Sequence, residues 1–423
     1  MDKKLTHIAL IIVCFFNLNL KPSAGALDAT FNPVGTPPGT VRYPTTSITL
    51  TGRALAVQTD GSVVIVGSVS TTSNAALVRY TNAGDLDPSF GSGGLVSTII
   101  GTNSAFFGVA IQPDGKIVVA GFGTLAGVDT FLSARYNTDG TLDASFGTGG
   151  IVTTPIGATA AAAFDLLLQP DGKIVAAGRS GGITQFVVVR YTTTGTLDGT
   201  FGTGGIVTTT LGAATSGNAV TLQPDGKIVV GGQSGSPATF TVVRYTTLGV
   251  LDTTFGGTGI VTTTIGGSST INDIMMQTTT GKIIAVGQRN LVGINNFTIA
   301  RYNLDGTLDA TFGSSGITTT AIGSSCQAFG AAIQQNGSIV ASGSSQQPTT
   351  TFTLARYTIN GTLDTLFGSA GVVLTPYAGS GTSGIARRVV IQNNGRIVAA
   401  GVFDNALGGA RYFGDSIIID VCA

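Results

Sequence analysis

One stretch of this chain recurs, with variations, from one end to the other. Its clearest copy is Arg135–Gly147, which reads RYNTDGTLDASFG. Asn137–Gly140 has the residues of a type I turn followed by a residue at positive φ, a favoured hairpin connection in which glycine fits without steric cost. Folding about this turn places Tyr136 opposite Leu142 and Arg135 opposite Asp143. The stretch therefore predicts a β-hairpin closed by an opposite-charge pair and an aromatic–aliphatic pair.

The repeat of this stretch sets the architecture. A Leu-Asp-x-x-Phe element occurs seven times, beginning at Leu27, Leu86, Leu142, Leu197, Leu251, Leu308 and Leu363. An Arg-Tyr element also occurs seven times, ending at Tyr80, Tyr136, Tyr191, Tyr245, Tyr302, Tyr357 and Tyr412. A second turn, Gln112–Lys116 (QPDGK), recurs intact or degenerate in each repeat, with proline and glycine at positions that suit a turn. The repeat length is about 56 residues, measured between Phe31 and Phe367.

Each repeat has room for about four strands. In the second copy we expect them at Phe106–Ile111, Lys116–Gly121, Thr130–Tyr136 and from Thr141 through Thr153. Four antiparallel strands per repeat are typical of a propeller blade, whereas a β-solenoid with coils of this length and hairpin turns at fixed offsets would be unusual. The sequence therefore predicts an all-β, seven-bladed β-propeller.

The two ends of the repeat array predict how the ring closes. The first Leu-Asp-x-x-Phe, at Leu27–Phe31, has no Arg-Tyr before it, and Arg411-Tyr412 has no Leu-Asp-x-x-Phe after it. We expect Leu27–Phe31 to supply the outer strand of the last blade and to pair with the strand that carries Arg411. The alternative is that Ile417–Val421 supplies this outer strand.

The repeated motifs resemble those of the delta-60 repeat family of exported bacterial proteins. The resemblance rests on Gln-Pro-Asp-Gly-Lys-Ile-Val and Arg-Tyr-x-x-x-Gly-x-Leu-Asp-x-x-Phe-Gly, and it covers nearly all of Leu27 to Tyr412. It implies a propeller-like repeat array and export. It implies no enzymatic activity, because the shared residues look structural.

Residues that recur in every blade are interpreted as structural. A catalytic site would ordinarily break the symmetry of the ring, whereas one Arg–Asp pair per blade preserves it. Asn137-x-Asp139-x-x-x-Asp143 also looks like part of a calcium loop, but other repeats lose these residues and the chain has no Glu for a bidentate ligand. The repeated pairs are Arg79 and Asp87, Arg135 and Asp143, Arg190 and Asp198, Arg244 and Asp252, Arg301 and Asp309, Arg356 and Asp364, and Arg411 and Asp28.

Composition excludes several kinds of chemistry. The chain has no Trp, and its single histidine is His7, near the N-terminus. Histidine-based catalytic triads and histidine-ligated metals therefore have no candidate residue beyond that segment. From Leu27 onward 18 basic residues stand against 20 Asp, which gives no reason to expect nucleic acid as a partner. We expect no cofactor and no metal.

The first 26 residues have the pattern of a secretory signal. Lys3 and Lys4 precede an apolar run, Ile8–Phe16, that is shorter than the roughly 20 residues of a membrane-spanning helix. Ala24-Gly25-Ala26 has the small-x-small pattern that signal peptidase accepts. We therefore expect residues 1–26 to be a signal peptide, residues 27–413 to be one propeller domain and residues 414–423 to be a C-terminal tail. An exported chain would permit a disulfide between Cys326 and Cys422, with free buried thiols as the alternative.

Residues that depart from the repeat are the candidates for a functional site. Five positions before the turn glutamine the repeats read Arg53, Phe107, Phe164, Asn218, Asn272, Phe329 and Arg387. Four positions before it they read Ala54, Gly108, Asp165, Ala219, Asp273, Gly330 and Arg388. We expect this strand to be innermost, beside the central channel. Its charges occur in only some repeats and predict a polar ligand-binding site at one channel mouth, with a solvated lining as the plainer interpretation. The candidate ligand-binding residues are Arg53, Asp165, Asp273, Arg387 and Arg388.

These observations favour a secreted or cell-surface propeller that acts as a non-enzymatic binding module. Two alternatives stay open: a propeller hydrolase or lyase that uses an Asp base, and a purely structural component of the envelope. We expect a monomer without a membrane span in its mature part, whose partner is a protein or polysaccharide at or outside the cell surface. If the channel charges do not bind, the variable loops Phe122–Asp129 and Ser344–Thr350 are the next candidates.

Overall fold

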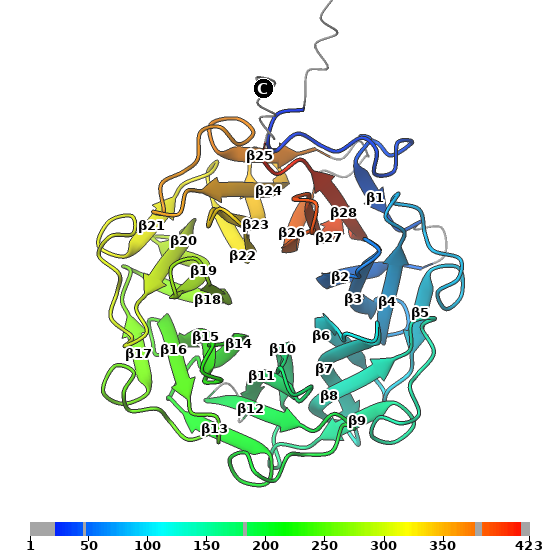
Figure 1. The fold of residues 1–423 in the computed structure, drawn as a ribbon, viewed down its shortest axis with the longest axis vertical. Coiled ribbons are helices and arrows are strands. Elements are labelled where there is room, and N and C mark those ends of the chain that lie inside the picture. The colour runs from blue at the N-terminus through cyan, green and yellow to red at the C-terminus, as the bar shows by residue number, and fades with distance from the viewer. Residues whose placement is uncertain (1–21, 45–47, 181–183, 377–382, 416–423) are drawn as a thin grey trace, which may run out of the picture.

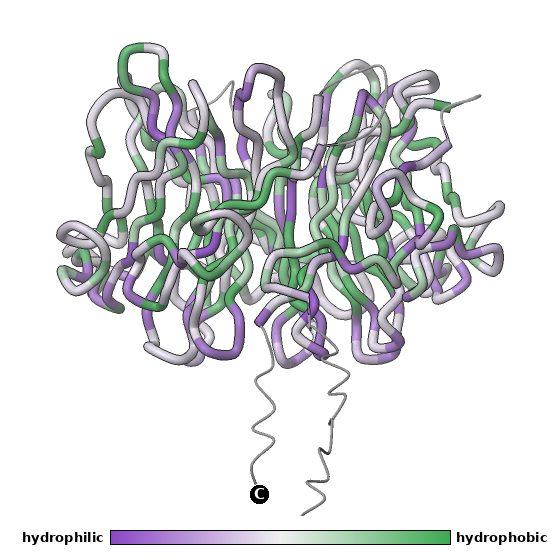
Figure 2. The backbone as a smooth tube through the Cα atoms, turned by 90° about the horizontal axis from the view of Figure 1, so that it is seen from above, coloured by the Kyte–Doolittle hydropathy of each residue, from purple (hydrophilic) through white to green (hydrophobic). Residues whose placement is uncertain are grey.

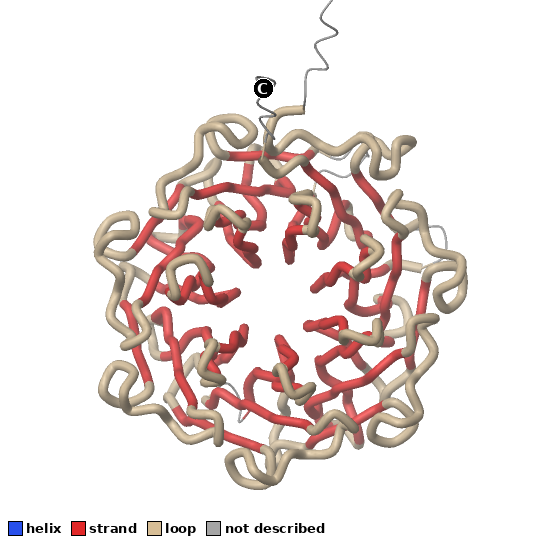
Figure 3. Tube along the Cα trace, in the orientation of Figure 1, coloured by secondary structure: helices blue, strands red, loops and turns tan. Residues whose placement is uncertain are grey.

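The computed structural model describes residues 22–44, 48–180, 184–376 and 383–415. Within these ranges the regular elements are all strands, joined by turns and loops (Figure 3). They form seven four-stranded antiparallel sheets arranged around a central axis (Figure 1), which confirms the predicted seven-bladed β-propeller. No helix of a length and hydrophobicity that could cross a membrane occurs in the described ranges.

The strands are given blade by blade, from the channel outward. They are β2 (Leu50–Val57), β3 (Val63–Val69), β4 (Asn74–Tyr80) and β5 (Leu95–Thr98) in blade 1; β6 (Ser104–Ile111), β7 (Ile117–Leu125), β8 (Val128–Tyr136) and β9 (Ile151–Thr154) in blade 2; β10 (Ala162–Leu168), β11 (Ile174–Ser180), β12 (Gln185–Tyr191) and β13 (Ile206–Thr210) in blade 3; β14 (Ser216–Leu222), β15 (Ile228–Ser234), β16 (Thr239–Tyr245) and β17 (Ile260–Thr263) in blade 4; β18 (Ser268–Gln277), β19 (Lys282–Leu291), β20 (Ile294–Tyr302) and β21 (Ile317–Thr320) in blade 5; β22 (Cys326–Ile333), β23 (Ile339–Gln346), β24 (Thr350–Tyr357) and β25 (Val372–Thr375) in blade 6; and β26 (Gly384–Ile391), β27 (Ile397–Phe403), β28 (Ala406–Tyr412) and β1 (Thr40–Arg42) in blade 7.

The hydrophobic core is divided among the interfaces between blades. Successive strand side chains point to opposite faces of a sheet, and in a propeller each face meets a different neighbouring blade. In β7, Ile117 and Val119 pack into the core shared with blade 1, and Val118 and Ala120 pack into the core shared with blade 3. Because both faces of the middle strands are buried, these strands read as continuous apolar runs rather than as an alternation with polar residues.

The repeated hairpin forms as predicted. The Asn137 amide donates to the Thr141 carbonyl at 2.8 Å, Tyr136 pairs with Leu142, and Gly140 has φ +87°. The expected fourth strand, Thr141–Thr153, is wrong in its first part, because the strand proper is β9, Ile151–Thr154. Asp143 Oδ1 accepts the amide and the hydroxyl of Ser145, which bends the chain. The glycines at 147, 149 and 150 then have positive φ, so this segment cannot be extended.

The repeated arginine joins neighbouring blades as well as closing its own hairpin. Arg135 Nε donates to Asp143 Oδ2 at 2.7 Å, and its Cζ lies 4.8 Å from the centre of the Phe146 ring. Its Nη1 donates to the Thr193 carbonyl in the next blade at 2.6 Å. The Tyr191 hydroxyl bonds back to Thr154 at 2.8 Å. The arginine therefore closes its own hairpin and also holds the turn of the following blade.

The N-terminal segment closes the ring, as expected. Leu27 pairs with Tyr412, and the Asp28 amide donates to the Arg411 carbonyl at 2.8 Å. The outer strand itself is β1, Thr40–Arg42, and not Leu27–Phe31, because the Thr30 amide and hydroxyl both bond to Asp28 Oδ1 and turn the chain there. The alternative strand Ile417–Val421 lies outside the described residues.

Ala24 and Gly25, in the segment expected to be a signal, lie in the same closing junction. The Gly368 amide donates to the Ala24 carbonyl, and the Gly25 amide donates to the Phe413 carbonyl. Between blades 1 and 2 the corresponding bond runs from the Gly91 amide to the Asp139 carbonyl. Ala24 and Gly25 therefore take the place of the turn residues Asp139 and Gly140. The junction thus rebuilds the repeated turn from two distant parts of the chain.

The ring has two faces, which differ in the connections that they carry. The turn face carries the Gln-x-x-Gly turns and the Arg-Tyr hairpins. The hairpin face carries the connections between the second and third strands of the blades, such as Ala126–Gly127 and Val292–Gly293. Figure 2 shows the ring edge-on, with loops at both faces and apolar residues concentrated between them.

Candidate functional site

Every innermost strand contains a β-bulge, and the bulge fixes which side chains enter the channel. In β2 the register with β3 shifts between Gly52 and Ala54, which leaves Arg53 as the extra residue. The equivalent shift occurs in each of the other six blades. A bulge adds an unpaired residue and re-aims its neighbours. The residue five positions before the turn glutamine, such as Arg53, is therefore the bulge residue. The residue four positions before it, such as Ala54, pairs again with the second strand of the blade.

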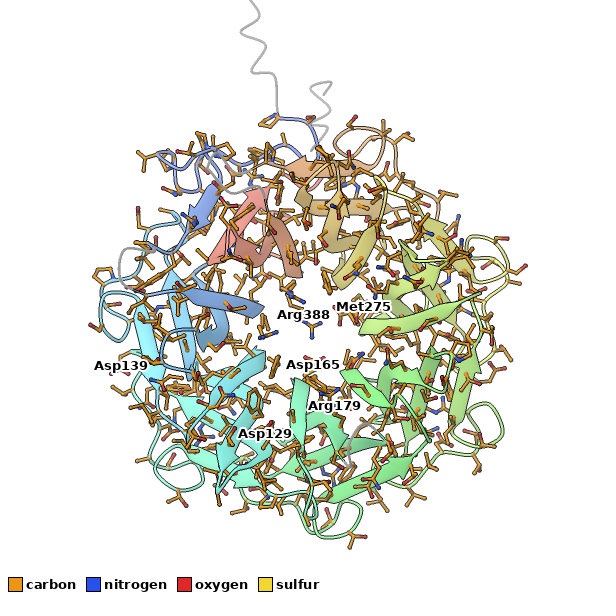
Figure 4. The ribbon with its side chains drawn as sticks, turned by 180° about the vertical axis from the view of Figure 1, so that it is seen from behind. Asp129, Asp139, Asp165, Arg179, Met275 and Arg388 are labelled. Carbon is orange, nitrogen blue, oxygen red and sulfur yellow. The ribbon has the colours of Figure 1, made fainter. Side chains whose placement is uncertain are left out.

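Three of the five candidate residues form one ion-paired cluster across the channel. Arg388 from blade 7 donates to Asp165 of blade 3 at 3.1 Å and to Asp273 of blade 5 at 2.6 Å. Figure 4 shows Arg388 and Asp165 pointing toward the centre of the ring. We call Asp165, Asp273 and Arg388 the channel triad. The sequence placed these residues at one offset, and the structure adds that they bond directly to one another.

The other oxygens of the triad carboxylates are also bonded. Asp165 Oδ2 accepts the amide of Val220, and Asp273 Oδ2 accepts the amide of Ala331. Each carboxylate thus ties its own blade to the following one, while Arg388 ties both to blade 7. Burial raises the pKa of Asp165, and the positive charge of Arg388 opposes that rise. Both carboxylates are therefore held by fixed partners.

The channel on the turn-face side of the triad is a cup lined by the triad and by aliphatic and methionine side chains. The inner strands run from the hairpin face toward the turn face, so residues after the triad line this cup. Its volume is about 430 Å³, and its wall includes Met275, Met276, Ile333 and Val390 as well as the triad. Sequence reasoning did not single out these residues, because they look like ordinary strand residues until the ring places them around one axis.

Arg53 and Arg387, the other two candidates, lie in the bulge layer and not in the triad. The Arg53 guanidinium lies 4.7 Å from the centre of the Phe107 ring, and that of Arg387 lies 4.6 Å from the centre of the Phe329 ring. Burial lowers the pKa of Arg53. Burial and the nearby charge of Arg53 lower the pKa of Arg387. The five candidates therefore occupy two adjacent layers of the channel.

Aromatic and basic side chains continue this wall toward the hairpin face. Phe107 stacks on Phe122 with ring centres 5.9 Å apart, and Arg179 lies over Phe164 at 5.3 Å. Phe122 opens the variable loop Phe122–Asp129, which the sequence analysis named as a second candidate. Sequence reasoning did not identify Arg179, because it considered only the innermost strands and Arg179 lies on β11, the second strand of blade 3.

The longest hairpins carry exposed apolar tips. The β19–β20 connection exposes Val292 at 94% and Ile294 at 51% of their surfaces, and Val128 on the β7–β8 hairpin is 38% exposed. The other predicted loop, Ser344–Thr350, contributes Gln347 and Thr349 to a pocket of about 180 Å³ beside Phe403. The hairpins on the hairpin face thus differ between blades in length, and the two longest carry exposed apolar residues at or beside their tips.

Cys326 is buried and fills a packing position. Its Sγ accepts the amides of Phe297 and Ile322, each at 3.3 Å. The hydroxyl of Ser269 accepts the Phe240 amide in the same way one blade earlier. Cys422 lies outside the described residues, so the disulfide stays a prediction.

The fold and the repeated bonds define a β-propeller repeat protein. Six segments, residues 58–90, 112–146, 169–201, 223–255, 279–312 and 334–367, match a family model described as "Domain of unknown function (DUF5122) beta-propeller". Each segment runs from the turn glutamine region to the Phe of Leu-Asp-x-x-Phe, so the match falls on the predicted repeat motifs. The delta-60 name itself stays a prediction. No curated protein matches the sequence.

Solved structures share the fold at low sequence identity. A hydrazine synthase of Kuenenia stuttgartiensis has a TM-score of 0.52 and 13% identity over 87% of this chain and 97% of that chain. YCF48 bound to a D1 peptide has a TM-score of 0.49 and 11% identity over 93% and 98% of the two chains. A glucose dehydrogenase has a TM-score of 0.45 and 12% identity over 90% and 100%. These likenesses concern the fold, and they include both enzymes and a binding protein.

Proposed function

We propose that this chain is an exported propeller that works as a non-enzymatic binding module and contacts its partner through the hairpin face. The partner is a protein or polysaccharide at or outside the cell surface. The observation that carries the proposal is the channel triad. Asp165 and Asp273 are the only carboxylates on the seven inner strands, all of which are described, and both are paired with Arg388.

A carboxylate base needs a free oxygen within reach of a substrate proton. In the triad, each carboxylate offers one oxygen to Arg388 and the other to a backbone amide. An Asp base is therefore less well supported than a binding role. On the turn face, the repeated charges are likewise used in bonds between blades, as Arg135 illustrates. The connections that vary most in length between blades lie on the hairpin face, which favours this face as the contact surface.

The proposal is tested by retention on the immobilised full chain. Envelope fractions and culture medium from the source cells are passed over the wild type, over Val292→Asp on the hairpin face and over Leu366→Asp on the turn face. Leu366 is a matched control because it is also a well-exposed apolar residue, at 81%. We expect a saturable partner that the wild type and the Leu366 variant retain and the Val292 variant loses. Equal retention by the wild type and both variants would contradict a contact through the hairpin face.

The same preparation separates the two alternatives. Incubation with the retained polysaccharides should release no shortened products. Release that disappears in Asp165→Asn would support the hydrolase or lyase instead. A chain that retains nothing but assembles with itself in sedimentation would support the structural component.

A further inference from the structure

Arg53 and Arg387 lie close enough in the bulge layer for their charges to interact, and no described residue supplies a counter-ion for either. They belong to blades 1 and 7, which are neighbours where the ring closes. No hydrogen bond or ion pair joins either guanidinium to another residue in the described ranges. In both residues Nε is buried and has no hydrogen-bond partner. A guanidinium has five N–H donors, and leaving a buried donor unpaired costs free energy.

The other contacts of the bulge layer are favourable. Bulge side chains lean toward the following blade: Arg53 onto Phe107, and Phe107 onto Phe164 with ring centres 5.5 Å apart. In blades 4 and 5 the bulge asparagines donate to the Ile271 and Ala328 carbonyls at 2.8 and 2.7 Å. At the junction between blades 7 and 1, two like charges meet instead. The bulge residues make favourable contacts at the other described junctions, whereas two positive charges repel each other here. This difference indicates that a negatively charged group binds between blades 7 and 1.

The nearest negative charges are already committed. Asp165 and Asp273 lie in the next layer, and Arg388 stands between them. The triad and the two arginines together leave one positive charge in excess. The aromatic rings of Phe107 and Phe329 cover one face of each guanidinium and leave its N–H edge for a ligand.

We propose that Arg53 and Arg387 form a binding site for a tetrahedral oxyanion group, phosphate or sulfate, that enters from the hairpin face. A dianion neutralises both guanidiniums at once, and its oxygens match the forked donors of arginine. The group is either a free inorganic ion or part of a phosphorylated or sulfated ligand. The entry of the ligand from the hairpin face rests on the proposed function. The two arginines add the class of ligand that binds there.

The test is calorimetric titration of the purified full chain with sodium sulfate and sodium phosphate, with sodium chloride at matched ionic strength as the reference. We expect saturable binding of one oxyanion per chain. Arg53→Gln and Arg387→Gln should each weaken it roughly tenfold or more, because one charge-assisted fork is lost. Arg289→Gln is the matched control, since Arg289 also has a buried Nε without a hydrogen-bond partner in the described ranges but lies on β19 in blade 5, and its replacement should leave the affinity unchanged.

Thermal melts of the same variants measure their stability and show separately whether sulfate binding stabilises the fold. Sulfate should raise the midpoint of the wild type in a saturable way and that of Arg387→Gln only through general exclusion from the surface. Arg387→Lys, which keeps the charge but not the fork, should bind with intermediate affinity. A rise that does not saturate and is equal in all variants overturns the proposal. So does the absence of heat in the wild-type titration.

Two further ligands identify the source of the oxyanion. Glucose 6-phosphate and glucose 6-sulfate should bind more tightly than the inorganic ions if the natural ligand is an ester, and no more tightly if it is a free ion. The calorimetry uses no cellular partner. A retained partner without oxyanion binding would therefore refute this inference alone, and oxyanion binding without a retained partner would leave the inference standing while the proposed function fails.

Discussion

Arg411 donates from Nε to Asp28 Oδ2 at 2.9 Å, although 383 residues separate them in sequence. In the other blades the same arginine–aspartate bond spans eight residues within one hairpin, as between Arg135 and Asp143. Arg411 Nη1 also reaches the Asn82 carbonyl of blade 1 at 2.7 Å. The repeated clamp is therefore completed at the ring junction by the two ends of the propeller, and this makes the junction a single point on which closure depends.

Asp28→Ala should be strongly destabilising. Asp28 is fully buried and accepts bonds from Arg411, Arg396 and Thr30. Its removal leaves the buried Arg411 without its counter-charge, which should lower the free energy of unfolding by about 3–5 kcal/mol. Asp143→Ala is the control: it should cost less, because the covalent turn of blade 2 still holds its hairpin. Denaturant melts measure both variants.

Deletion of Leu27 to Asn32 tests the same closure at the level of the segment. It should lower the thermal midpoint markedly, because it leaves strand edges unpaired at the junction. An unchanged midpoint, either here or for Asp28→Ala, would count against ring closure by this segment.

Gly140→Val should destabilise more than Thr138→Ala. Gly140 has φ +87°, where a β-branched residue is strained by about 1–2 kcal/mol. A Cβ at this position would also lie 2.7 Å from Val96 and 3.0 Å from Phe90 of the preceding blade. Thr138 contributes its backbone carbonyl to Arg79, and this bond survives in Thr138→Ala. Equal midpoints in urea would mean that the turn is not as described.

Arg388→Met should destabilise the fold at neutral pH by about 3–5 kcal/mol, because two buried carboxylates lose their shared cation. The folded-state pKa of Asp165, which burial raises, should then lie further above its unfolded value, because the charge of Arg388 no longer opposes the rise. Stability should therefore rise as pH falls from 7 to 5 in this variant, as that carboxylate takes up a proton. The neutral triple variant Asp165→Asn, Asp273→Asn, Arg388→Met is the control and should lack this pH dependence.

The triad also changes what is expected of Asp165 and Asp273. The sequence predicted both as ligand-binding residues, but in the structure the pair is the counter-charge of Arg388. We now expect Asp165→Ala with Asp273→Ala to lower stability as well, because Arg388 would be left buried and unpaired. A wild-type midpoint for this double variant would show that the triad bears no structural role.

Acid should weaken the wild-type protein through the repeated clamps. Burial opposes ionisation of Asp252, but the hydroxyl of Thr254, Lys227 and Arg244 lower its pKa to about 2. Lys116 hydrogen-bonds to Asp143 and, against the effect of burial, lowers the pKa of that carboxyl well below its usual range. A lowered folded-state pKa gives stability that is complete above the unfolded value of about 4 and is lost as pH falls through the folded value. Midpoints measured between pH 5 and 2 should fall steadily, and Asp252→Asn should flatten that slope.

The blade number, the hairpins and the closing offset could all be predicted from the repeated motifs. These depend on local chemistry: Gly140 takes positive φ, Asp143 lies eight residues from Arg135, and the spacing repeats with every blade. The position of the outer strand was not predicted. It lies at Thr40–Arg42 because Thr30 bonds to Asp28 and bends the chain, whereas the Leu-Asp-x-x-Phe motif was interpreted as an extended strand.

Only the tertiary structure decided which channel charges meet. Asp165, Asp273 and Arg388 share one offset from their turns, and so do Arg53 and Arg387, but the bulge separates the two sets into adjacent layers. Side chains from blades 3, 5 and 7 can bond only because seven strands converge on one axis, and no local pattern records the distance across a channel. The bonded triad and the two unpaired arginines beside it are therefore products of ring closure, in which residues far apart in sequence are brought within a few ångströms.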